Sequence, residues 1–321
     1  MTATILVTGA SGAAGQFVVP ALLEAGFKVR GQYARNPGAA RDVEWRQMDF
    51  LNADHFAPLV EGCDAVVHLA AELRQTDVMD RVNVDATRNL AAAAAAVGVR
   101  YFGHASSVVV YGSPLSPQVD ESTRRIDPRA PIGKQYLAEP YMCDYARTKA
   151  LAEEALEALA PAMSVDMYRP AVVADLDRLL EARDWSLPRK IFSLHRRTQY
   201  VYAADAAAAI LHLIKRGLAA PAGVRSISAY NICDESAGLY RDLLRVGREH
   251  TQDPRYSAPM ELPYVADILK QTVKHRTLTF RYPLGMLRFS NAKLRATGFE
   301  LPIGMPAALK LAFGRASQAP V

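Results

Sequence analysis

The sequence predicts an α/β fold in which a doubly wound parallel sheet is joined to a smaller, mixed C-terminal lobe. Apolar segments of strand length alternate with helical segments through the first half of the chain. A glycine-rich turn joins the first strand to the first helix, and the second half loses the alternation and is interrupted by proline. Because strand–helix–strand connections are right-handed, repeated alternation produces a parallel sheet with helices on both faces.

The first strand–helix–strand unit begins close to the N-terminus. We expect an apolar strand at residues 5–7, followed by an alanine- and leucine-rich helix that ends at Gly26. A second strand is expected at residues 28–32. The first element of the fold is therefore a complete βαβ unit.

The turn after the first strand has the spacing G-x-x-G-x-x-G. Glycine lets the backbone turn tightly, approach a pyrophosphate and pack the helix on the sheet. Unpaired N–H groups and the helix dipole at the start of the helix favour a phosphate there. The position of the turn, after a strand and before a helix, supports a Rossmann-type dinucleotide site. The residues expected to contact the cofactor here are Gly9, Ala10, Ser11, Gly12, Ala13, Ala14 and Gly15.

The alternation continues beyond this unit. We expect a buried strand at residues 64–71, a helix at 84–98 and another strand at 100–112. Ligands of parallel sheets bind at the carboxyl ends of the strands. Ser106 and Ser107 stand near such an end and are candidates for the site.

Tyr145 and Lys149 are a candidate acid/base pair. They are four residues apart in a predicted helix, so their side chains lie on one face. A nearby cation favours a phenolate and lowers the pKa of a tyrosine from its ordinary value of about 10. His68 and His104 are other possible bases, but both lie within predicted strands and are interpreted as structural.

The sequence resembles the extended short-chain dehydrogenase/reductase family, which includes epimerase/dehydratase and 3β-hydroxysteroid dehydrogenase-like enzymes. The motifs follow the family's order through most of the chain. They are "TGASGAAG" (8–15), "MDF" (48–50), "VVHLAA" (66–71), "VNVDATRNL" (82–90), "SSVVVYG" (106–112), "YARTK" (145–149), "YRPAVV" (168–173), "VYAAD" (201–205), "YNICD" (230–234) and "FSNAKLRATGF" (289–299).

The resemblance implies roles for individual residues. Ser107 is expected to hydrogen-bond the reacting oxygen, Tyr145 to exchange the proton, and Lys149 to hold the nicotinamide ribose while favouring the phenolate. Asn83 is a candidate support for a proton-relay water, and a polar residue at a helix start is the alternative. The other expected cofactor contacts are Asp49 and Phe50 beside the adenine, and Leu69, Ala70, Ala71, Ser106, Pro170 and Val172 along the groove.

The end of the second strand bears on the choice of cofactor. NAD-preferring relatives have an acidic residue there for the ribose 2′-OH, whereas an arginine accommodates a 2′-phosphate. No acidic residue occurs between Ala25 and Asp42, and Arg30 and Arg35 are available. NADP(H) is therefore favoured over NAD(H), although Tyr33 falls where an aspartate often stands and the loop is one residue longer than in similar reductases.

The chain is expected to form a dinucleotide-binding core at residues 1–173 and a mainly substrate-binding lobe at 174–321, with a late strand or strands returning to the core. The first 180 residues hold 17 Lys and Arg against 22 Asp and Glu, and the rest hold 21 against 11. The basic half favours a substrate that carries a phosphate or another anionic group, with a solvated surface as the alternative.

The residues after Ser107 exclude two of the reactions that the family catalyses. Sugar dehydratases need a carboxylate pair and 3,5-epimerases a cysteine at this strand end, where this chain has Val108 and Val109. A ketone reductase or alcohol dehydrogenase and a nucleotide-sugar 4-epimerase remain. Thr198 and Gln199 stand where 4-epimerases have an Arg-Asp pair. The basic residues close by that could hold a diphosphate in another way are Arg189, Lys190, Arg196 and Arg197.

Two broader alternatives follow from composition and motifs. A dinucleotide-binding regulator without catalytic activity is the least favoured alternative. Such proteins usually lose the tyrosine or the lysine, and this chain has both. Three widely spaced cysteines argue against a disulfide framework or a zinc site and favour a cytoplasmic protein. No nucleic-acid motif or membrane span is evident. The alanine-rich helix at 84–98 favours a homodimer, with packing on the sheet as its alternative.

Overall fold

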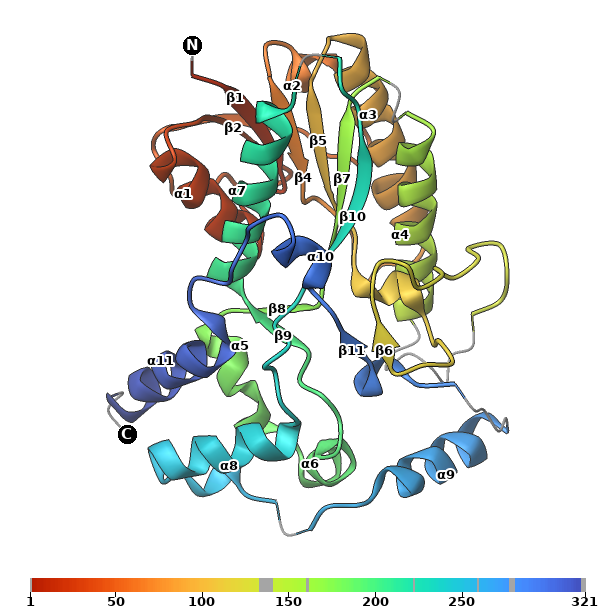
Figure 1. The fold of residues 1–321 in the computed structure, drawn as a ribbon, viewed down its shortest axis with the longest axis vertical. Helices are drawn as coiled ribbons and strands as arrows, with labels where there is room; N and C mark the ends of the chain where they lie inside the picture. The colour runs from red at the N-terminus through yellow and green to blue at the C-terminus, as the bar shows by residue number, and fades with distance from the viewer. Residues whose placement is uncertain are drawn as a thin grey trace.

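The computed structural model describes residues 2–132, 141–159, 162–221, 223–258, 260–276 and 281–318. It confirms the predicted fold: seven parallel strands form one sheet in the order β10-β7-β5-β4-β1-β2-β3 (Figure 1). The strands are β1 (Thr4–Thr8), β2 (Lys28–Tyr33), β3 (Val43–Gln47), β4 (Ala65–His68), β5 (Tyr101–Ala105), β7 (Ser164–Pro170) and β10 (Ile227–Ile232).

Helices cover both faces of this sheet, as Figure 1 shows. Neighbouring residues of a strand point to opposite faces. Ile5 and Val7 therefore pack with α1 (Gly15–Glu24) and α7 (Ala203–Ala219), whereas Leu6 packs with α2 (Ala57–Val60) and α3 (Ala86–Ala96) on the other face. Helix α4 (Tyr141–Glu157) lies beside α3, so the sheet is buried on both sides.

The strand predicted at residues 100–112 is shorter in the structure, which is a correction. Strand β5 ends at Ala105, and a short 3₁₀ helix, η2 (Val108–Tyr111), follows. The Ser107 hydroxyl oxygen accepts a hydrogen bond from the backbone N–H of Val109 at 3.4 Å and caps this helix. A serine that bonds the backbone locally favours such a turn over continued strand. The edge strand β3 was not predicted, because its polar residues hide the strand pattern.

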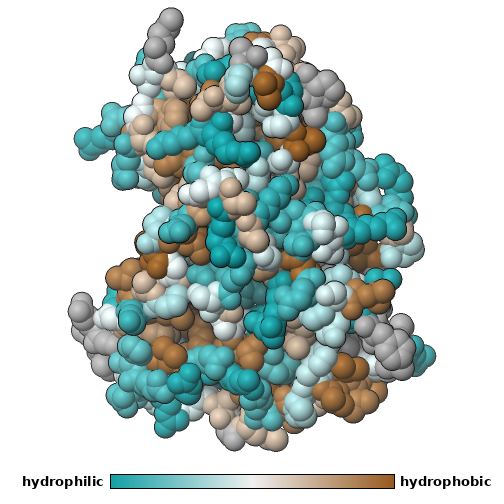
Figure 2. Space-filling view, viewed as in Figure 1, coloured by the Kyte–Doolittle hydropathy of each residue, from teal (hydrophilic) through white to brown (hydrophobic). Residues whose placement is uncertain are grey.

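The remaining elements form the second lobe, below the sheet in Figure 1, and the connections to it. Figure 2 shows that the outline of the molecule narrows between the two parts. Helix α7 and strand β10 return from this half of the sequence to the sheet. The other elements are η1 (Asp80–Asp85), β6 (Gln118–Val119), β8 (Val172–Ala174), α5 (Leu176–Leu180), η4 (Glu181–Asp184), α6 (Leu187–Ser193), β9 (Tyr200–Tyr202), α8 (Tyr240–Thr251), η5 (Pro254–Tyr256), α9 (Tyr264–His275), η6 (Leu284–Met286), β11 (Arg288–Phe289), α10 (Ala292–Arg295) and α11 (Gly304–Gln318).

The described residues contain neither a candidate membrane span nor a candidate metal site. None of the helices in this part of the chain has the length and apolar character needed to cross a membrane. Within the same residues, no group of three or more His, Cys, Asp and Glu side chains could hold a metal ion.

Gly103 of β5 gives a stability test of the core. A Cβ at this position would overlap the Tyr168 hydroxyl, which is held by a 2.7 Å hydrogen bond with the Tyr101 hydroxyl. We expect Gly103→Ala to lower the free energy of unfolding by about 1–3 kcal/mol, measured by urea denaturation, because the ring must move. In the control Gly314→Ala, a Cβ would have no atom within 4 Å and α11 should be unchanged or slightly more stable. Equal effects of the two substitutions would contradict this description of the core.

Candidate active site

The predicted site residues gather at the carboxyl edge of the sheet. The glycine turn follows β1, Ala70 follows β4, Ser107 follows β5, and Pro170 ends β7. Strands β1 and β4 are neighbours from which the chain continues in opposite directions across the sheet. A crevice at this kind of switch point is where open α/β sheets bind their ligands.

The glycine turn has the geometry of a phosphate cradle. Gly9 has a φ of +62°, and a Cβ there would lie 3.0 Å from the backbone of Ala70. A Cβ at Gly15 would overlap the carbonyl oxygen of Ala10. Helix α1 begins here, and no side chain caps its N-terminus. The N–H groups of Gln16 and Phe17 donate to backbone carbonyl oxygens, whereas within the described residues those of Ala13, Ala14 and Gly15 make no hydrogen bond. These three N–H groups fit a dinucleotide phosphate.

Buried polar side chains hold this turn in place. The Gln32 amide oxygen accepts from the Gly9 N–H at 2.9 Å, and its NH₂ group donates to the Met48 carbonyl oxygen at 2.6 Å. The Thr8 hydroxyl oxygen accepts from the N–H groups of Leu69 and Ala70 at 3.1 and 3.2 Å. Sequence analysis missed both side chains. Both are polar residues at the carboxyl ends of neighbouring strands, and this position could have indicated that they lie at the site.

The end of β2 carries no carboxylate. Gln32 is buried, and the Tyr33 ring packs edge-on against Trp45 with 6.0 Å between the ring centroids. Arg35 is exposed in the loop that follows. Burial raises the pKa of the Glu72 carboxyl, but hydrogen bonds from the backbone N–H groups of residues 73–75 and the charge of Arg35 lower it by more. The pKa of Glu72 is therefore below its ordinary value. Arg35 therefore lies near the loop after β4, at the same edge of the sheet as the glycine turn.

Arg30 does not lie where it was predicted to act, which is a correction. Its guanidinium pairs with Glu44 at 3.0 Å. It also donates to the carbonyl oxygens of Leu59 and Glu61 at 2.9 and 2.7 Å. The latter two residues precede β4, so the side chain extends toward the amino edge of the sheet, away from the glycine turn. It is therefore not available to a cofactor phosphate.

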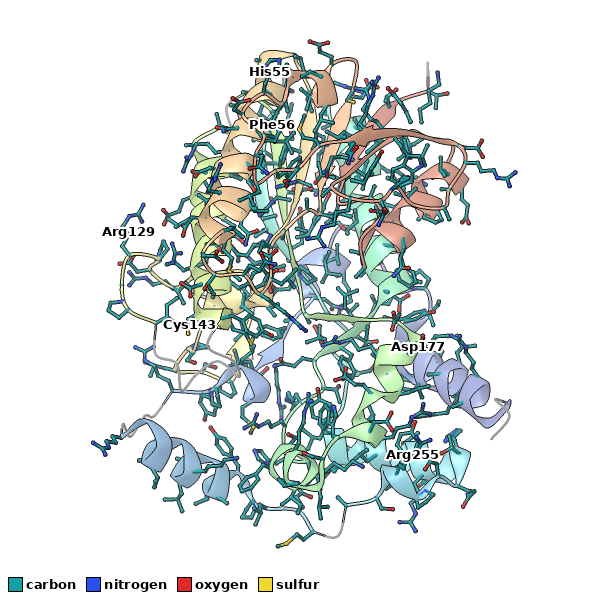
Figure 3. The ribbon with its side chains drawn as sticks, turned by 180° about the vertical axis from the view of Figure 1, so that it is seen from behind. His55, Phe56, Arg129, Cys143, Asp177 and Arg255 are labelled. Carbon is teal, nitrogen blue, oxygen red and sulfur yellow. The ribbon has the colours of Figure 1, made fainter. Side chains whose placement is uncertain are left out.

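Phe50 is a second correction. Its ring is buried in the core, with the Phe56 and His68 rings at centroid distances of 5.3 and 5.9 Å. From there the ring cannot lie beside an adenine. Figure 3 labels Phe56 at the start of α2, on the side of the sheet where this cluster lies. Asp49, the other residue predicted at the adenine, is exposed, and its carboxylate accepts from the Leu51 N–H at 3.0 Å.

Tyr145 and Lys149 lie one turn apart on α4, beside the end of β5. The Lys149 ammonium nitrogen is 5.7 Å from the centroid of the Tyr145 ring and donates to the Ala105 carbonyl oxygen at 2.7 Å. Tyr145 packs against Val109 of η2, the helix that Ser107 caps. Cys143, in the first turn of α4 (Figure 3), precedes this pair by two residues, a spacing that does not share a helix face.

The pKa directions differ from the prediction. Burial raises the pKa of the Tyr145 phenol instead of Lys149 lowering it. Burial lowers the pKa of Lys149 to about 7, although the charge of Glu153 opposes this change. The ammonium faces a backbone carbonyl and not the phenol oxygen. The phenol is therefore protonated at neutral pH and suited to donating a proton.

A buried network of an ion pair and hydrogen bonds joins α4 to the sheet. Arg169 of β7 donates to both carboxylate oxygens of Glu153, at 2.9 and 2.7 Å. Arg169 also donates to the Tyr111 hydroxyl at 2.9 Å, which donates to the Asn231 amide oxygen at 2.7 Å. The network joins α4, β7, η2 and β10. This network was not predicted from the sequence, although Glu153 follows Lys149 by four residues and therefore lies on the same helix face.

Asn83 joins three segments of the chain, and its predicted support for a proton-relay water stays a prediction. Its amide oxygen accepts from the Glu72 N–H at 2.8 Å, and its NH₂ group donates to the Glu72 carbonyl oxygen at 2.8 Å and to the Thr148 hydroxyl at 3.2 Å. It thereby ties the loop after β4 to η1 and α4. His68 and His104 are fully buried in β4 and β5, and the interpretation of both as structural stays a prediction.

Comparisons with known proteins agree with this geometry. Residues 5–233 match the NAD dependent epimerase/dehydratase family. The chain is 27% identical over 253 residues to the uncharacterized protein y4nG of Sinorhizobium fredii, covering 78% of this chain and 61% of that protein. It is 33% identical over 136 residues to cinnamoyl-CoA reductase 2 of Medicago truncatula, covering 37% of this chain and 40% of that protein. The matches thus span less than two thirds of these relatives' own length.

The fold also matches solved structures. One is a short-chain dehydrogenase/reductase superfamily protein from Agrobacterium tumefaciens with bound NAD. Its TM-score is 0.74 at 24% identity, over 98% of this chain and 97% of that chain. The alignment covers both lobes, and it shows that the described residues share the fold of that protein.

Burial of Lys149 leads to a prediction about pH and stability. The folded protein holds this group with a pKa of about 7, whereas a lysine in an unfolded chain titrates near about 10.4. Between these values the unfolded chain binds more protons, so the free energy of unfolding rises with pH. We expect Lys149→Met to stabilise the cofactor-free protein by roughly 2–4 kcal/mol near about pH 6 and by much less near about pH 10.

Urea unfolding of both proteins at the two pH values measures this difference. The matched control is Lys310→Met, which replaces an exposed lysine of α11 and should change stability little at either pH. A gain from Lys149→Met that stays constant or grows with pH would contradict the burial of a titrating ammonium at this site.

Proposed function

The chain belongs to the NAD dependent epimerase/dehydratase family, and on this basis we propose that it is an NADP(H)-dependent ketone reductase or alcohol dehydrogenase. The observation that carries the proposal is the placement of Tyr145 and Lys149 on one face of α4, beside the end of β5. When bound, the nicotinamide supplies or accepts the hydride. Ser107, Tyr145 and Lys149 orient the substrate oxygen and handle its proton.

The three side chains are suited to different parts of this task. The Ser107 oxygen accepts a bond from the Val109 N–H, which leaves its own O–H to donate to a carbonyl oxygen. The raised pKa of Tyr145 keeps the phenol protonated, as a proton donor to the developing alkoxide must be. Lys149 is anchored at the Ala105 carbonyl oxygen, and its side-chain nitrogen lies 5.7 Å from the centroid of the phenol ring.

The surroundings of Ser107 and of β9 favour a reductase over the other reactions of the family. The two residues that follow Ser107, Val108 and Val109, are apolar and buried, so no carboxylate stands there to assist the elimination of water. The Thr198 hydroxyl donates to the Gly238 carbonyl oxygen at 3.2 Å, and the Gln199 amide donates to the Leu284 carbonyl oxygen at 2.5 Å. Both side chains are thus engaged with backbone at the place where nucleotide-sugar 4-epimerases are expected to use an arginine.

A homodimer and a cytoplasmic location remain proposals. Helices α3 and α4 lie side by side on the outside of the sheet (Figure 1). Ala92 and Ala96 of α3 are exposed, whereas Ala91 and Ala94 pack on the sheet. The exposed methyl groups allow close packing of a second copy, and the mass of the protein in solution decides between the two uses of these alanines.

Tyr145→Phe is the direct test of the proposed chemistry. Removing the phenol oxygen should reduce turnover by about 100-fold or more, because proton transfer to the substrate is lost. The affinity for NADPH should change little. Turnover is measured as NADPH consumption with a panel of ketones, and affinity by fluorescence titration. The control Tyr240→Phe removes a phenol oxygen of the second lobe and should retain activity.

Three results of that assay would count against the proposal. Full turnover by Tyr145→Phe would exclude the phenol as proton donor. Interconversion of a nucleotide sugar without net consumption of cofactor would identify an epimerase. Cofactor binding by the wild-type protein without turnover of any carbonyl or nucleotide sugar would favour an inactive dinucleotide-binding protein.

The preference for NADP(H) rests on Arg35 alone, since Arg30 is engaged elsewhere. We expect NADPH to bind more tightly than NADH, because an exposed arginine at the end of β2 can pair with a 2′-phosphate. Arg35→Ala should weaken NADPH binding by about tenfold and leave NADH binding unchanged. Arg41→Ala, an exposed arginine of the same loop, is the control. Equal affinities for the two cofactors in the wild-type protein would contradict this preference.

A further inference from the structure

Helix α9 (Tyr264–His275) turns an apolar stripe to the outside of the molecule. It lies in the second lobe, at the end away from the sheet (Figure 1). Val265, Leu269 and Val273 follow one another at intervals of four residues and form this stripe along the helix. Their exposed fractions are 61%, 61% and 77%. Packing within this chain therefore leaves the stripe open to a partner.

Other side chains of α9 hold the helix against the lobe. The Tyr264 ring lies 5.6 Å from the His195 ring, and the Lys270 ammonium nitrogen lies 3.9 Å from the centroid of the Phe192 ring. A surface helix normally buries its apolar stripe and shows its charged side chains to solvent. In α9 a lysine packs on the lobe, and Figure 3 shows side chains of this helix that project away from the rest of the molecule. Burial within this chain does not account for the stripe.

The stripe differs from the other apolar side chains on the surface because its members are contiguous. Leu115 and Leu311 are also exposed, but they belong to separate segments. Single exposed apolar residues are normal on proteins, whereas a contiguous group marks a surface that binds something. Figure 2 shows apolar side chains gathered over α9, at the lower right of the view. We therefore treat the stripe as an interaction surface.

Basic residues accompany the stripe. The basic residues of segment 264–276 besides His275 are Lys270, Lys274 and Arg276, and its acidic residue is Asp267. The side chains of Lys270 and Arg276 are exposed. Just before the helix, the Glu261 carboxylate is paired with Arg241 at 3.2 Å. This end of the lobe therefore combines an apolar stripe with an excess of positive charge.

The charge of this segment distinguishes between the possible partners. A second copy of the chain would bring the same basic helix against itself, and like charges at such a contact repel each other. An anionic lipid bilayer offers negative head groups next to an apolar layer, which is where basic amphipathic helices lie. The long apolar stems of lysine and arginine let their charged ends stay at the head groups. The combination of stripe and charge therefore favours a lipid surface.

We propose that α9 binds the surface of an anionic lipid bilayer, with Val265, Leu269 and Val273 in the apolar boundary and Lys270 and Arg276 at the head groups. The helix has 12 residues, whereas a span takes about 20, so it lies along the surface. One short helix binds reversibly, and anionic lipids of the cytoplasmic leaflet are a suitable surface. None of the candidate catalytic residues belongs to α9, so this proposal does not depend on the proposed function.

Co-sedimentation of the full chain with lipid vesicles tests the surface without any need for turnover. We expect binding to vesicles of phosphatidylglycerol and phosphatidylcholine at low salt, weaker binding as salt is added, and little binding to phosphatidylcholine alone. Leu269→Gln should weaken binding by about fivefold, and the triple substitution of the stripe by Gln should weaken it by about tenfold or more. Lys270→Gln combined with Arg276→Gln should also weaken it by about tenfold. The matched control is Leu311→Gln, which replaces an exposed leucine of α11.

The outcomes separate a lipid surface from the other partners. Unchanged unfolding midpoints show that the variants are folded, because all the substituted side chains are exposed. Absence of binding by the wild-type protein at low salt, or undiminished binding by the triple variant, would overturn the proposal. Equal binding to charged and uncharged vesicles would overturn the choice of an anionic surface. A mass in solution that falls from two chains to one in the triple variant would assign the stripe to a second copy of the chain.

Discussion

The ion pair between Glu153 and Arg169 holds the candidate active site together. Both groups are buried, and a charge without a partner in such a place is costly, so the pair constrains where α4 lies against β7. The bonds from Arg169 to Tyr111 and from Tyr111 to Asn231 extend the constraint to η2 and β10. Since Tyr145, Lys149 and Glu153 share one helix face, fixing the last of them also sets the position of the first two.

A second constraint comes from the backbone at the glycine turn. The turn passes so close to Ala70 and to the start of α1 that side chains are excluded at Gly9 and Gly15. The Gln32 amide oxygen then accepts from the Gly9 N–H of the turn, and the Thr8 hydroxyl oxygen accepts from the Leu69 N–H in the loop after β4. Backbone bonds from Gln16 and Phe17 to the carbonyl oxygens of Gly12 and Ala14 also hold the turn, so the cradle is formed before any ligand arrives.

Between these two regions, burial changes the pKa values of the candidate catalytic side chains. Lys149 is in a place where its charge is disfavoured, and the nearby Glu153 limits that effect. The Tyr145 phenol is held protonated by its surroundings. The arrangement favours donation of a proton to a substrate oxygen.

The sequence by itself determined the order of strands and helices through the first half, the glycine turn, and the one-turn spacing of Tyr145 and Lys149. These features depend on neighbours along the chain, which patterns of apolar residues and glycine record. Only the tertiary structure decided that Arg30 reaches the opposite edge of the sheet, that Phe50 is in the core, and that Asn83 clamps a loop. It also brought Glu153 beside Arg169. These contacts join different strands, helices and loops of the lobe that contains the sheet, so their geometry arises only when those elements pack together.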